Sequence, residues 1–353
     1  TLDPSSRPKL KLVCRNNSSM SGRQIKIFSG NAHPELAKGI CKYLNRDVAK
    51  SSCRTFKNGE IGVKVGESVR DCDVYIVQPT CSSGTLSCND ALMELLIMAD
   101  AMRRGSAHKI TAVLPVYGYA RQDKKDKARA PISAKLVANL LIAGGFTRII
   151  TMDLHASQIQ GFFDIPVDNL FGEILFVNKI KKKFGEMGIH DENAEKNKEL
   201  VIVSPDAGGV KRAKSVADHL NCGLCIIHKE RKRANEVSNM TLVGNVQGKV
   251  AFLVDDIADT LGTLCLAAET LEANGAKEVY ALVIHGVLSG PAIDRLNKSV
   301  IKQCWCTNTI PQAEKLKLTK KLKVIDVAKL FGESIRRIQH GESVSQLFQM
   351  NIF

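Results

Sequence analysis

Residues 251–263, AFLVDDIADTLGT, carry the strongest structural signal in the chain. The stretch starts as an apolar run typical of a buried strand, continues with two adjacent acids, and ends in small residues that open a helix. A buried strand joined to a helix by a polar turn is the repeating unit of a parallel sheet covered by helices. This stretch therefore predicts an α/β fold.

The rest of the chain repeats the alternation of short apolar runs and helical patterns. We expect strands at 25–29, 74–78, 110–115, 148–153, 200–204, 223–228, 250–255, 279–284 and 300–306. We expect helices at 33–45, 90–104, 132–144, 210–220, 264–274 and 327–339, with Pro131 in the first turn of the third. A length of 353 residues suits two α/β domains, with ligands beyond the carboxyl ends of the strands.

The polar end of the 251–263 stretch suits a phosphorylated sugar. At a strand end, Asp255 and Asp256 can turn toward the vicinal hydroxyls of a ribose. The turn that follows can direct N–H groups and hydroxyls at a phosphate on the helix N-terminus, through Asp259, Thr260, Leu261, Gly262 and Thr263. An acidic turn that merely caps the helix would also explain Asp259 and Thr260. The complete pattern is rarer than such a cap and favours a ribose 5-phosphate site.

Composition limits the partners and the compartment. Lys and Arg number 50 against 36 Asp and Glu, so the net charge of +14 suits an anionic partner. Basic residues are spread along the chain without a nucleic-acid-binding pattern, and no apolar run is long enough to cross a bilayer, so we expect neither nucleic acid nor membrane as a partner. Eleven irregularly spaced cysteines favour buried thiols in a reducing compartment, and a cytoplasmic location is expected.

Three further polar clusters follow strand-like runs. Residues 119–132, YARQDKKDKARAPI, fit a nucleotide triphosphate clamp, although a solvated loop would have the same composition. Asp153 and His155 are two positions apart and can face the same way. Lys229 and Arg231 lie in a basic stretch, where two cations could neutralise charge on a transferring phosphoryl group.

The 251–263 stretch resembles the phosphoribosyl-diphosphate loop shared by type I phosphoribosyltransferases and ribose-phosphate diphosphokinases. Residues 119–132, 151–169 and 228–237 resemble the diphosphokinases alone, as do 56–60, 204–209 and 308–311. The likeness covers about residues 24–350. The chain is thus identified as a member of the class I ribose-phosphate diphosphokinase (phosphoribosyl pyrophosphate synthetase) family. The resemblance implies two domains of the type I phosphoribosyltransferase-like fold, each a mainly parallel sheet flanked by helices.

The resemblance also implies boundaries and an activity. Residues 24–172 would form an ATP-binding domain and 173–337 a ribose 5-phosphate-binding domain, while a segment at about 338–350 would return to the first. Residues 1–23 are expected to be a disordered or processed extension. The enzyme would transfer the diphosphoryl group of Mg-ATP to O1 of ribose 5-phosphate and release AMP.

Residue roles carried over from the family follow the matching motifs. ATP would contact Arg121, Gln122, Asp126 and His155, with Phe56, Asn58 and Glu60 holding the adenine from a neighbouring subunit. Mg²⁺ would be bound at a site formed by Asp153, His155, Asp164, Asp168 and Asp206. Lys229, Arg231 and His155 would be catalytic.

A regulatory site for ADP and phosphate is implied by Ser68, Arg70, Ser157, Gln160 and Ser343, in a homo-oligomer of dimers forming a hexamer. Two positions depart from the family pattern: Gly118 stands where proline is expected, and Ala128 lacks a hydroxyl. Three alternatives remain at this point: a catalytically silent associated subunit, a phosphoribosyltransferase, and, on charge alone, a nucleic-acid-binding protein.

Overall fold

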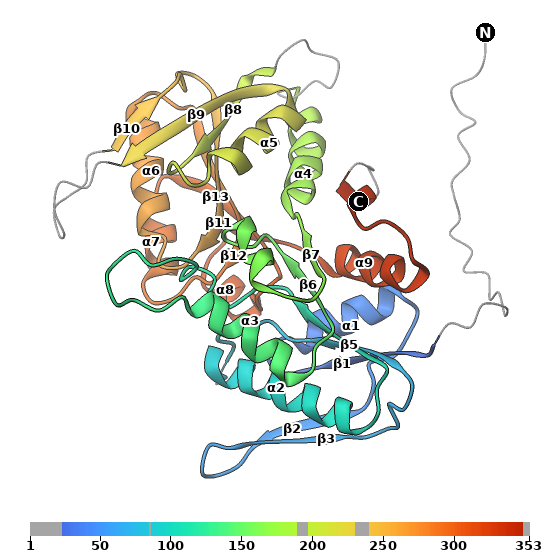
Figure 1. Cartoon of the computed structure of the whole chain (residues 1–353). Coiled ribbons are helices and arrows are strands. Elements are labelled where there is room, and N and C mark those ends of the chain that lie inside the picture. Colours follow the sequence, from blue (N-terminus) through green and yellow to red (C-terminus); the bar gives the residue numbers. More distant parts are fainter. Residues whose placement is uncertain (1–22, 85, 189–196, 230–239, 349–353) are drawn as a thin grey trace, which may run out of the picture.

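Two mainly parallel sheets lie one above the other in the computed structural model (Figure 1). The structure describes residues 23–84, 86–188, 197–229 and 240–348. For Lys229 it describes the backbone alone. The first sheet has the strand order β1-β4-β5-β6-β7. Its strands are all parallel and span Ile25–Ser29, Asp73–Val77, Lys109–Leu114, Arg148–Met152 and Val167–Leu170. Helices α1 (Pro34–Tyr43), α2 (Cys88–Arg104) and α3 (Ser133–Gly144) accompany it. A separate hairpin of β2 (Ser51–Thr55) and β3 (Ile61–Val65) extends below it.

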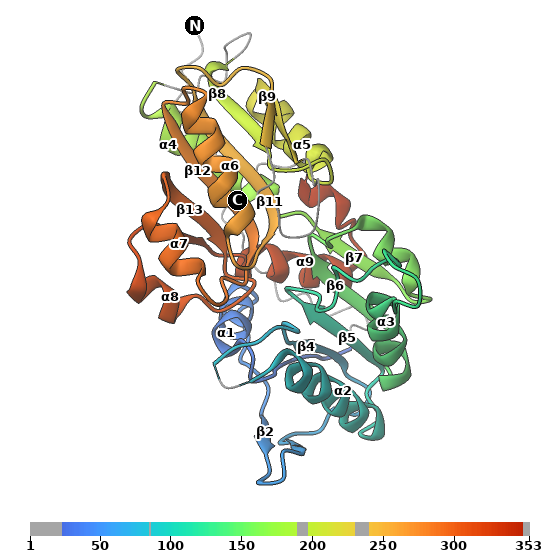
Figure 2. The ribbon, with the colours of Figure 1, turned by 90° about the vertical axis from the view of Figure 1, so that its left-hand side faces the viewer.

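The second sheet has the order β10-β9-β8-β11-β12-β13-β14. Only β10 (Met240–Val243) runs antiparallel to its neighbour. The parallel strands are β8 (Asn197–Ser204), β9 (Cys222–Lys229), β11 (Val250–Ala258), β12 (Glu278–Gly286), β13 (Ile301–Thr307) and β14 (Leu322–Ile325). Its helices are α4 (Glu173–Gly185), α5 (Val210–Leu220), α6 (Gly262–Ala273), α7 (Ala292–Lys298) and α8 (Ala313–Leu318), seen from the side in Figure 2.

The α/β fold with two mainly parallel sheets confirms the predicted fold class. Strands β2, β3, β7, β10 and β14 and helices α4, α7 and α8 were not predicted, and two predicted positions differ locally. Strand β11 continues through Ala258, so Asp255 and Asp256 lie inside the strand and not at its end. Pro131 precedes Ile132, the N-cap of α3, and is therefore outside the first helical turn. The predicted extension 1–22 lies outside the described residues. In the described part of the chain, no helix has the length and apolarity needed to cross a bilayer.

The chain returns to its first half through the whole of α9 (Ala328–His340), earlier than the segment expected at about 338 (Figure 1). Helix α9 packs closely against α1, because a Cβ on Gly39 would come within 2.9 Å of the Ala328 Cβ. The Gln339 amide also donates to Asp73 beside β4, at 3.0 Å. The N-terminal half is thus completed by residues from the end of the chain.

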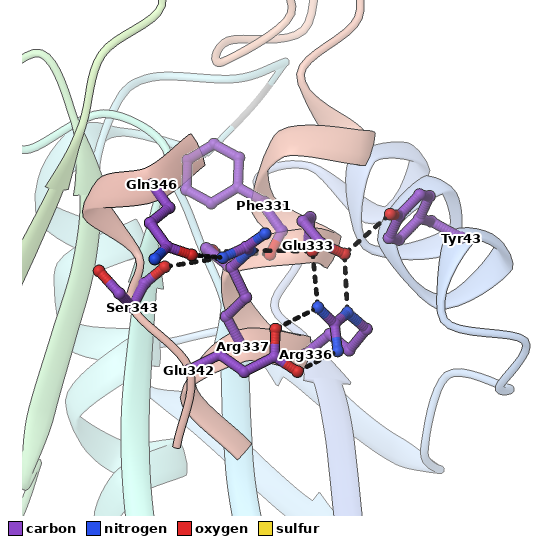
Figure 3. A network of polar contacts seen from close by, with 9 residues as sticks. Tyr43, Phe331, Glu333, Arg336, Arg337, Glu342, Ser343 and Gln346 are labelled. Atoms are coloured by element: carbon purple, nitrogen blue, oxygen red, sulfur yellow. Dashed lines mark hydrogen bonds and ion pairs between the residues drawn. The ribbon is translucent and has the colours of Figure 1, made fainter. Parts of the chain in front are cut away.

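A buried carboxylate organises this contact (Figure 3). Glu333 is 5% exposed and accepts from the Tyr43 hydroxyl of α1 at 2.9 Å. It also accepts from the guanidinium groups of Arg336 at 2.8 Å and Arg337 at 3.0 Å. Arg337 is itself buried, so Glu333 supplies the charge that makes its burial tolerable.

Removing this carboxylate should destabilise the protein strongly. We expect Glu333→Ala to lower the free energy of unfolding by about 3–5 kcal/mol, because it removes the carboxylate with which the buried Arg337 pairs at 3.0 Å. Glu342→Ala is the matched control: the Glu342 side chain is far more exposed and, among the described residues, pairs with Arg336 alone, so its loss should cost about 1 kcal/mol or less. Urea denaturation of the two variants measures the difference, and equal effects would contradict this account of Glu333.

Candidate active site

A cavity of about 670 Å³ lies between the two halves of the chain. The first half lines it with Arg121, Asp123, Lys124, Asp126, Asp153 and His155, among others. The second half contributes Asp206, Lys211, Arg212, Asp255 and Asp256. The Asp255-Asp256 pair of β11 and the basic segment after β5 therefore face one common space, whereas residues 259–263 do not line it.

A hydrogen bond joins the halves across this cavity. His155 Nδ1 lies 2.6 Å from the Asp256 carboxylate, so this nitrogen donates and Nε2 is left for a ligand. Arg212, in the first turn of α5, lies close to the pair. Its guanidinium is 3.7 Å from Asp256 and 3.9 Å from Asp153.

Charge and burial give the acids of the cavity different pKa values. The hydrogen bond to Asp256 raises the pKa of His155 above its usual value. Burial alone would raise the pKa of Asp256, but the His155 bond and the nearby Arg212 lower it. Burial and the neighbouring Asp256 raise the pKa of Asp255 well above its usual value, and burial raises that of Asp153 to about 7. Of the two adjacent acids, Asp256 is the charged one and Asp255 binds its proton more tightly.

The turn after β11 presents unpaired donors. We call residues 259–263 the phosphate loop. Within the described chain, the N–H groups of Thr260, Leu261, Gly262 and Thr263 have no acceptor. Gly262 and Thr263 begin α6, where the helix dipole adds positive potential. An anion is the natural partner for such a set. Arg121 reaches this loop from the other half and binds the Asp259 carboxylate at 2.8 Å.

Three residues of the motif-bearing segments have strained backbones, and one of them, Asp153, lines the cavity. Asp153, Tyr119 and Leu261 all have positive φ, at 41°, 61° and 60°, although none is glycine. Such conformations cost about 1 kcal/mol or more each and are concentrated at functional sites. These backbone conformations were not predicted from the sequence.

The expected metal ligands do not all meet. Asp168 pairs with Arg148, and neither Asp168 nor Asp164 lines the cavity. Because side chains alternate along β7, Asn169 faces the cavity in place of Asp168. No group of three or more His, Cys, Asp or Glu in the described residues could hold a metal ion. Of the five residues expected to bind Mg²⁺, Asp153, His155 and Asp206 line the cavity and Asp164 and Asp168 do not. Their role stays a prediction.

The predicted ATP residues divide into two places. Arg121 and Asp126 line the cavity, whereas Gln122 accepts a hydrogen bond from Ser133 and is not in the wall. Phe56 lies on the β2–β3 hairpin and is 43% exposed, and the Arg54 guanidinium carbon lies 4.8 Å from the centre of its ring. Asn58 and Glu60 lie in the same hairpin. These three are remote from the cavity of their own chain, so their role stays a prediction that needs a second subunit.

The remaining predicted residues are dispersed. Of the regulatory set, Ser157 lines the cavity, but Ser68, Arg70, Gln160 and Ser343 do not. Arg231 and the side chain of Lys229 lie outside the described residues. At Gly118, a Cβ would come within 2.5 Å of the Thr80 carbonyl, and the Gly118 N–H donates to the Thr80 hydroxyl at 2.7 Å, so this departure from the family fits its surroundings.

Sequence reasoning missed Lys211, Arg212, Asn169 and Phe171, which also line the cavity. A signal for Arg212 existed. It lies six residues after Asp206, in the first turn of the helix that the SPDAGG turn opens. Asn169 in β7 and Phe171 just after it are two positions apart and face the same side, and the sequence alone could not show which side that is.

Comparisons with known proteins agree with this geometry. The model of the N-terminal domain of ribose phosphate pyrophosphokinase matches residues 25–145, and that of the phosphoribosyl synthetase-associated domain matches 233–349. Ribose-phosphate pyrophosphokinase A of Dictyostelium discoideum is 58% identical over 327 residues, which are 93% of this chain and 98% of the relative. The chain belongs to the ribose-phosphate pyrophosphokinase family.

Other members of the ribose-phosphate pyrophosphokinase family support the same assignment. Ribose-phosphate pyrophosphokinase 2 of Schizosaccharomyces pombe is 53% identical over 332 residues, 94% of this chain and 99% of the relative. The crystal structure of phosphoribosylpyrophosphate synthetase from Mycobacterium smegmatis superposes with a TM-score of 0.81 at 42% identity and covers 90% of this chain and 100% of that one. The family and the fold class predicted from the motifs are both confirmed.

The bond between the halves predicts the titration of His155. We expect Asp256→Asn to lower the pKa of His155, because the neutral amide cannot stabilise the imidazolium as the carboxylate does. Asp164→Asn, which removes an acid outside the cavity, should leave it unchanged. A titration of the histidine nitrogens by NMR makes the measurement, and an unaltered His155 pKa in Asp256→Asn would contradict the contact.

Proposed function

We propose that the protein transfers the diphosphoryl group of ATP to O1 of ribose 5-phosphate, which gives 5-phosphoribosyl 1-diphosphate and AMP for nucleotide biosynthesis. One observation carries the proposal: the Asp255-Asp256 pair shares a cavity with Arg121 and His155 from the other half, and Arg121 also binds Asp259 of the phosphate loop. The cavity thus offers a sugar phosphate and a nucleotide adjoining places.

The sugar would enter on the side of β11. Its 5-phosphate would accept hydrogen bonds from the unpaired N–H groups of Thr260 to Thr263, while Asp255 and Asp256 would bind the 2- and 3-hydroxyls. The two carboxyl groups differ, because burial raises the pKa of Asp255 while His155 and Arg212 lower that of Asp256. Such a pair suits two neighbouring hydroxyls.

The triphosphate would lie toward Arg121, Asp126 and His155. Binding there would oblige Arg121 to exchange its contact with Asp259 for phosphate oxygens, a geometry that a guanidinium fits well. Lys229 and Arg231 would neutralise the charge that develops as the β-phosphorus is attacked by O1. The protein's contribution is then to position the reactants and to stabilise charge, without a covalent intermediate.

Mg²⁺ fits the cavity as a companion of the triphosphate. Its wall offers His155 and Asp206 with several acids nearby, but no three-ligand cluster in the described residues, so substrate phosphates and water would supply most ligands. When bound, the ion would neutralise phosphate charge and orient the triphosphate. Asp206 accepts from the Gly209 N–H at 2.9 Å, which holds its carboxylate in place.

A second subunit would complete the nucleotide site with Phe56, Asn58 and Glu60. The exposed hairpin that presents them supports a homo-oligomer, with dimers assembled into a hexamer. ADP and phosphate would act as effectors through the predicted regulatory residues. A cytoplasmic location suits the unpaired thiols of the ten described cysteines.

The activity itself is the first test. We expect AMP to be released from ATP only when ribose 5-phosphate and Mg²⁺ are both present, because the phosphorylated sugar is the acceptor. Liquid chromatography of the nucleotides makes the measurement. Release of AMP without the sugar, or none at any phosphate concentration, would refute the assignment and favour the silent associated subunit.

A second test addresses the transition state. Lys229→Ala should lower kcat by about 10³-fold or more while binding of ribose 5-phosphate changes little, because the cation would act on charge that develops during transfer. Lys214→Ala is the control, since Lys214 pairs on the surface with Asp218 at 2.7 Å. A Lys229→Ala enzyme with ordinary kcat would remove Lys229 from the mechanism.

A further inference from the structure

The phosphate loop rests on a second segment of the chain, residues 286–295, which we call the support loop. It runs from the end of β12 into α7. The Leu288 N–H donates to the Ala258 carbonyl at 2.9 Å, and the Ser289 N–H donates to the Asp259 carbonyl at 3.0 Å. Arg295 then donates through Nη1 to the Thr260 carbonyl at 2.9 Å. Three consecutive carbonyls are thus bound by the same segment.

This anchoring fixes the direction of the N–H groups. In a trans peptide, the carbonyl of one residue and the N–H of the next point in opposite directions. The described chain has no cis peptide, so the N–H of Leu261 points away from Arg295. The N–H of Thr260 likewise points away from Ser289. The support loop therefore turns the phosphate-binding donors toward the opposite side.

The peptide between Thr260 and Leu261 needs such an anchor most. Leu261 has a φ of 60°, in the left-handed region, which costs a non-glycine residue about 1 kcal/mol or more. Rotation of this peptide would relieve the strain and withdraw the Leu261 N–H from the anion. Arg295 is the side chain that holds the Thr260 carbonyl in place.

Arg295 also adds charge at this point. Its Nη1 lies so close to the loop that a Cβ on Gly262 would approach it to 3.3 Å. Within the described residues, the Arg295 guanidinium has no carboxylate partner and makes one hydrogen bond, to the Thr260 carbonyl. Its positive charge therefore adds to the potential around the loop from the carbonyl side of this peptide.

We infer that Arg295 is a positioning residue for the 5-phosphate: it holds the Thr260–Leu261 peptide in its anion-binding orientation and reinforces the positive potential of the loop. The inference rests on the proposed function, since it assigns the phosphate loop to the sugar phosphate. It concerns affinity for one substrate and leaves the nucleotide side untouched.

Steady-state kinetics of Arg295→Ala, Arg295→Lys and Lys298→Ala test the inference. We expect Arg295→Ala to raise the KM for ribose 5-phosphate roughly tenfold, with the KM for ATP changed less than about twofold. Arg295→Lys keeps a cationic donor and should restore the KM to within about threefold of the native enzyme. Lys298→Ala removes the same charge from the same helix without touching the loop, and should behave as the native enzyme.

Thermal unfolding of the three variants accompanies the kinetics, because Arg295 is exposed and its loss should leave the midpoint nearly unchanged. An unchanged KM for ribose 5-phosphate in Arg295→Ala, or an equal rise in both KM values, would overturn the role of Arg295. If the native enzyme forms no AMP with ribose 5-phosphate, the proposed function fails instead, and the two outcomes are distinct.

Discussion

The hydrogen bond between His155 and Asp256 is the constraint on which the site depends. It joins the segment after β6 in one half to β11 in the other, and holds the Asp255-Asp256 pair and the basic segment after β5 against one cavity. Neither partner is costly to bury here, because the imidazole and carboxylate satisfy each other and Arg212 adds a compensating charge. The bond from Arg121 to Asp259 adds a second contact, which joins the basic segment directly to the phosphate loop.

The sites at the two sides of the cavity use different kinds of donor. The phosphate loop offers fixed backbone N–H groups held by a neighbouring segment, whereas the nucleotide side offers long cationic side chains such as Arg121. Fixed donors suit a group that stays in place during the reaction. Side chains that exchange partners suit a group that is transferred and must leave.

Sequence patterns predicted the structural features that depend on residues close together in the chain. The apolar runs located the strands, and the acid pair followed by small residues located the phosphate loop, because both follow from the periodicity and chemistry of neighbouring residues. The motifs also identified the family. Sequence patterns could not show that Asp168 would pair with Arg148, nor that Arg212 would lie close to Asp256. Those contacts depend on strand orientation and on how the halves meet, which no local pattern encodes.

The position of α9 has a consequence for how the chain is made. Helix α1, near the beginning of the chain, is covered by residues 328–340, near its end. While a ribosome is still adding the second sheet, the side of α1 that later meets α9, with Gly39 and Tyr43, lacks this neighbour. The first half therefore cannot reach its final packing until synthesis is almost complete, although most of its own strands are translated early.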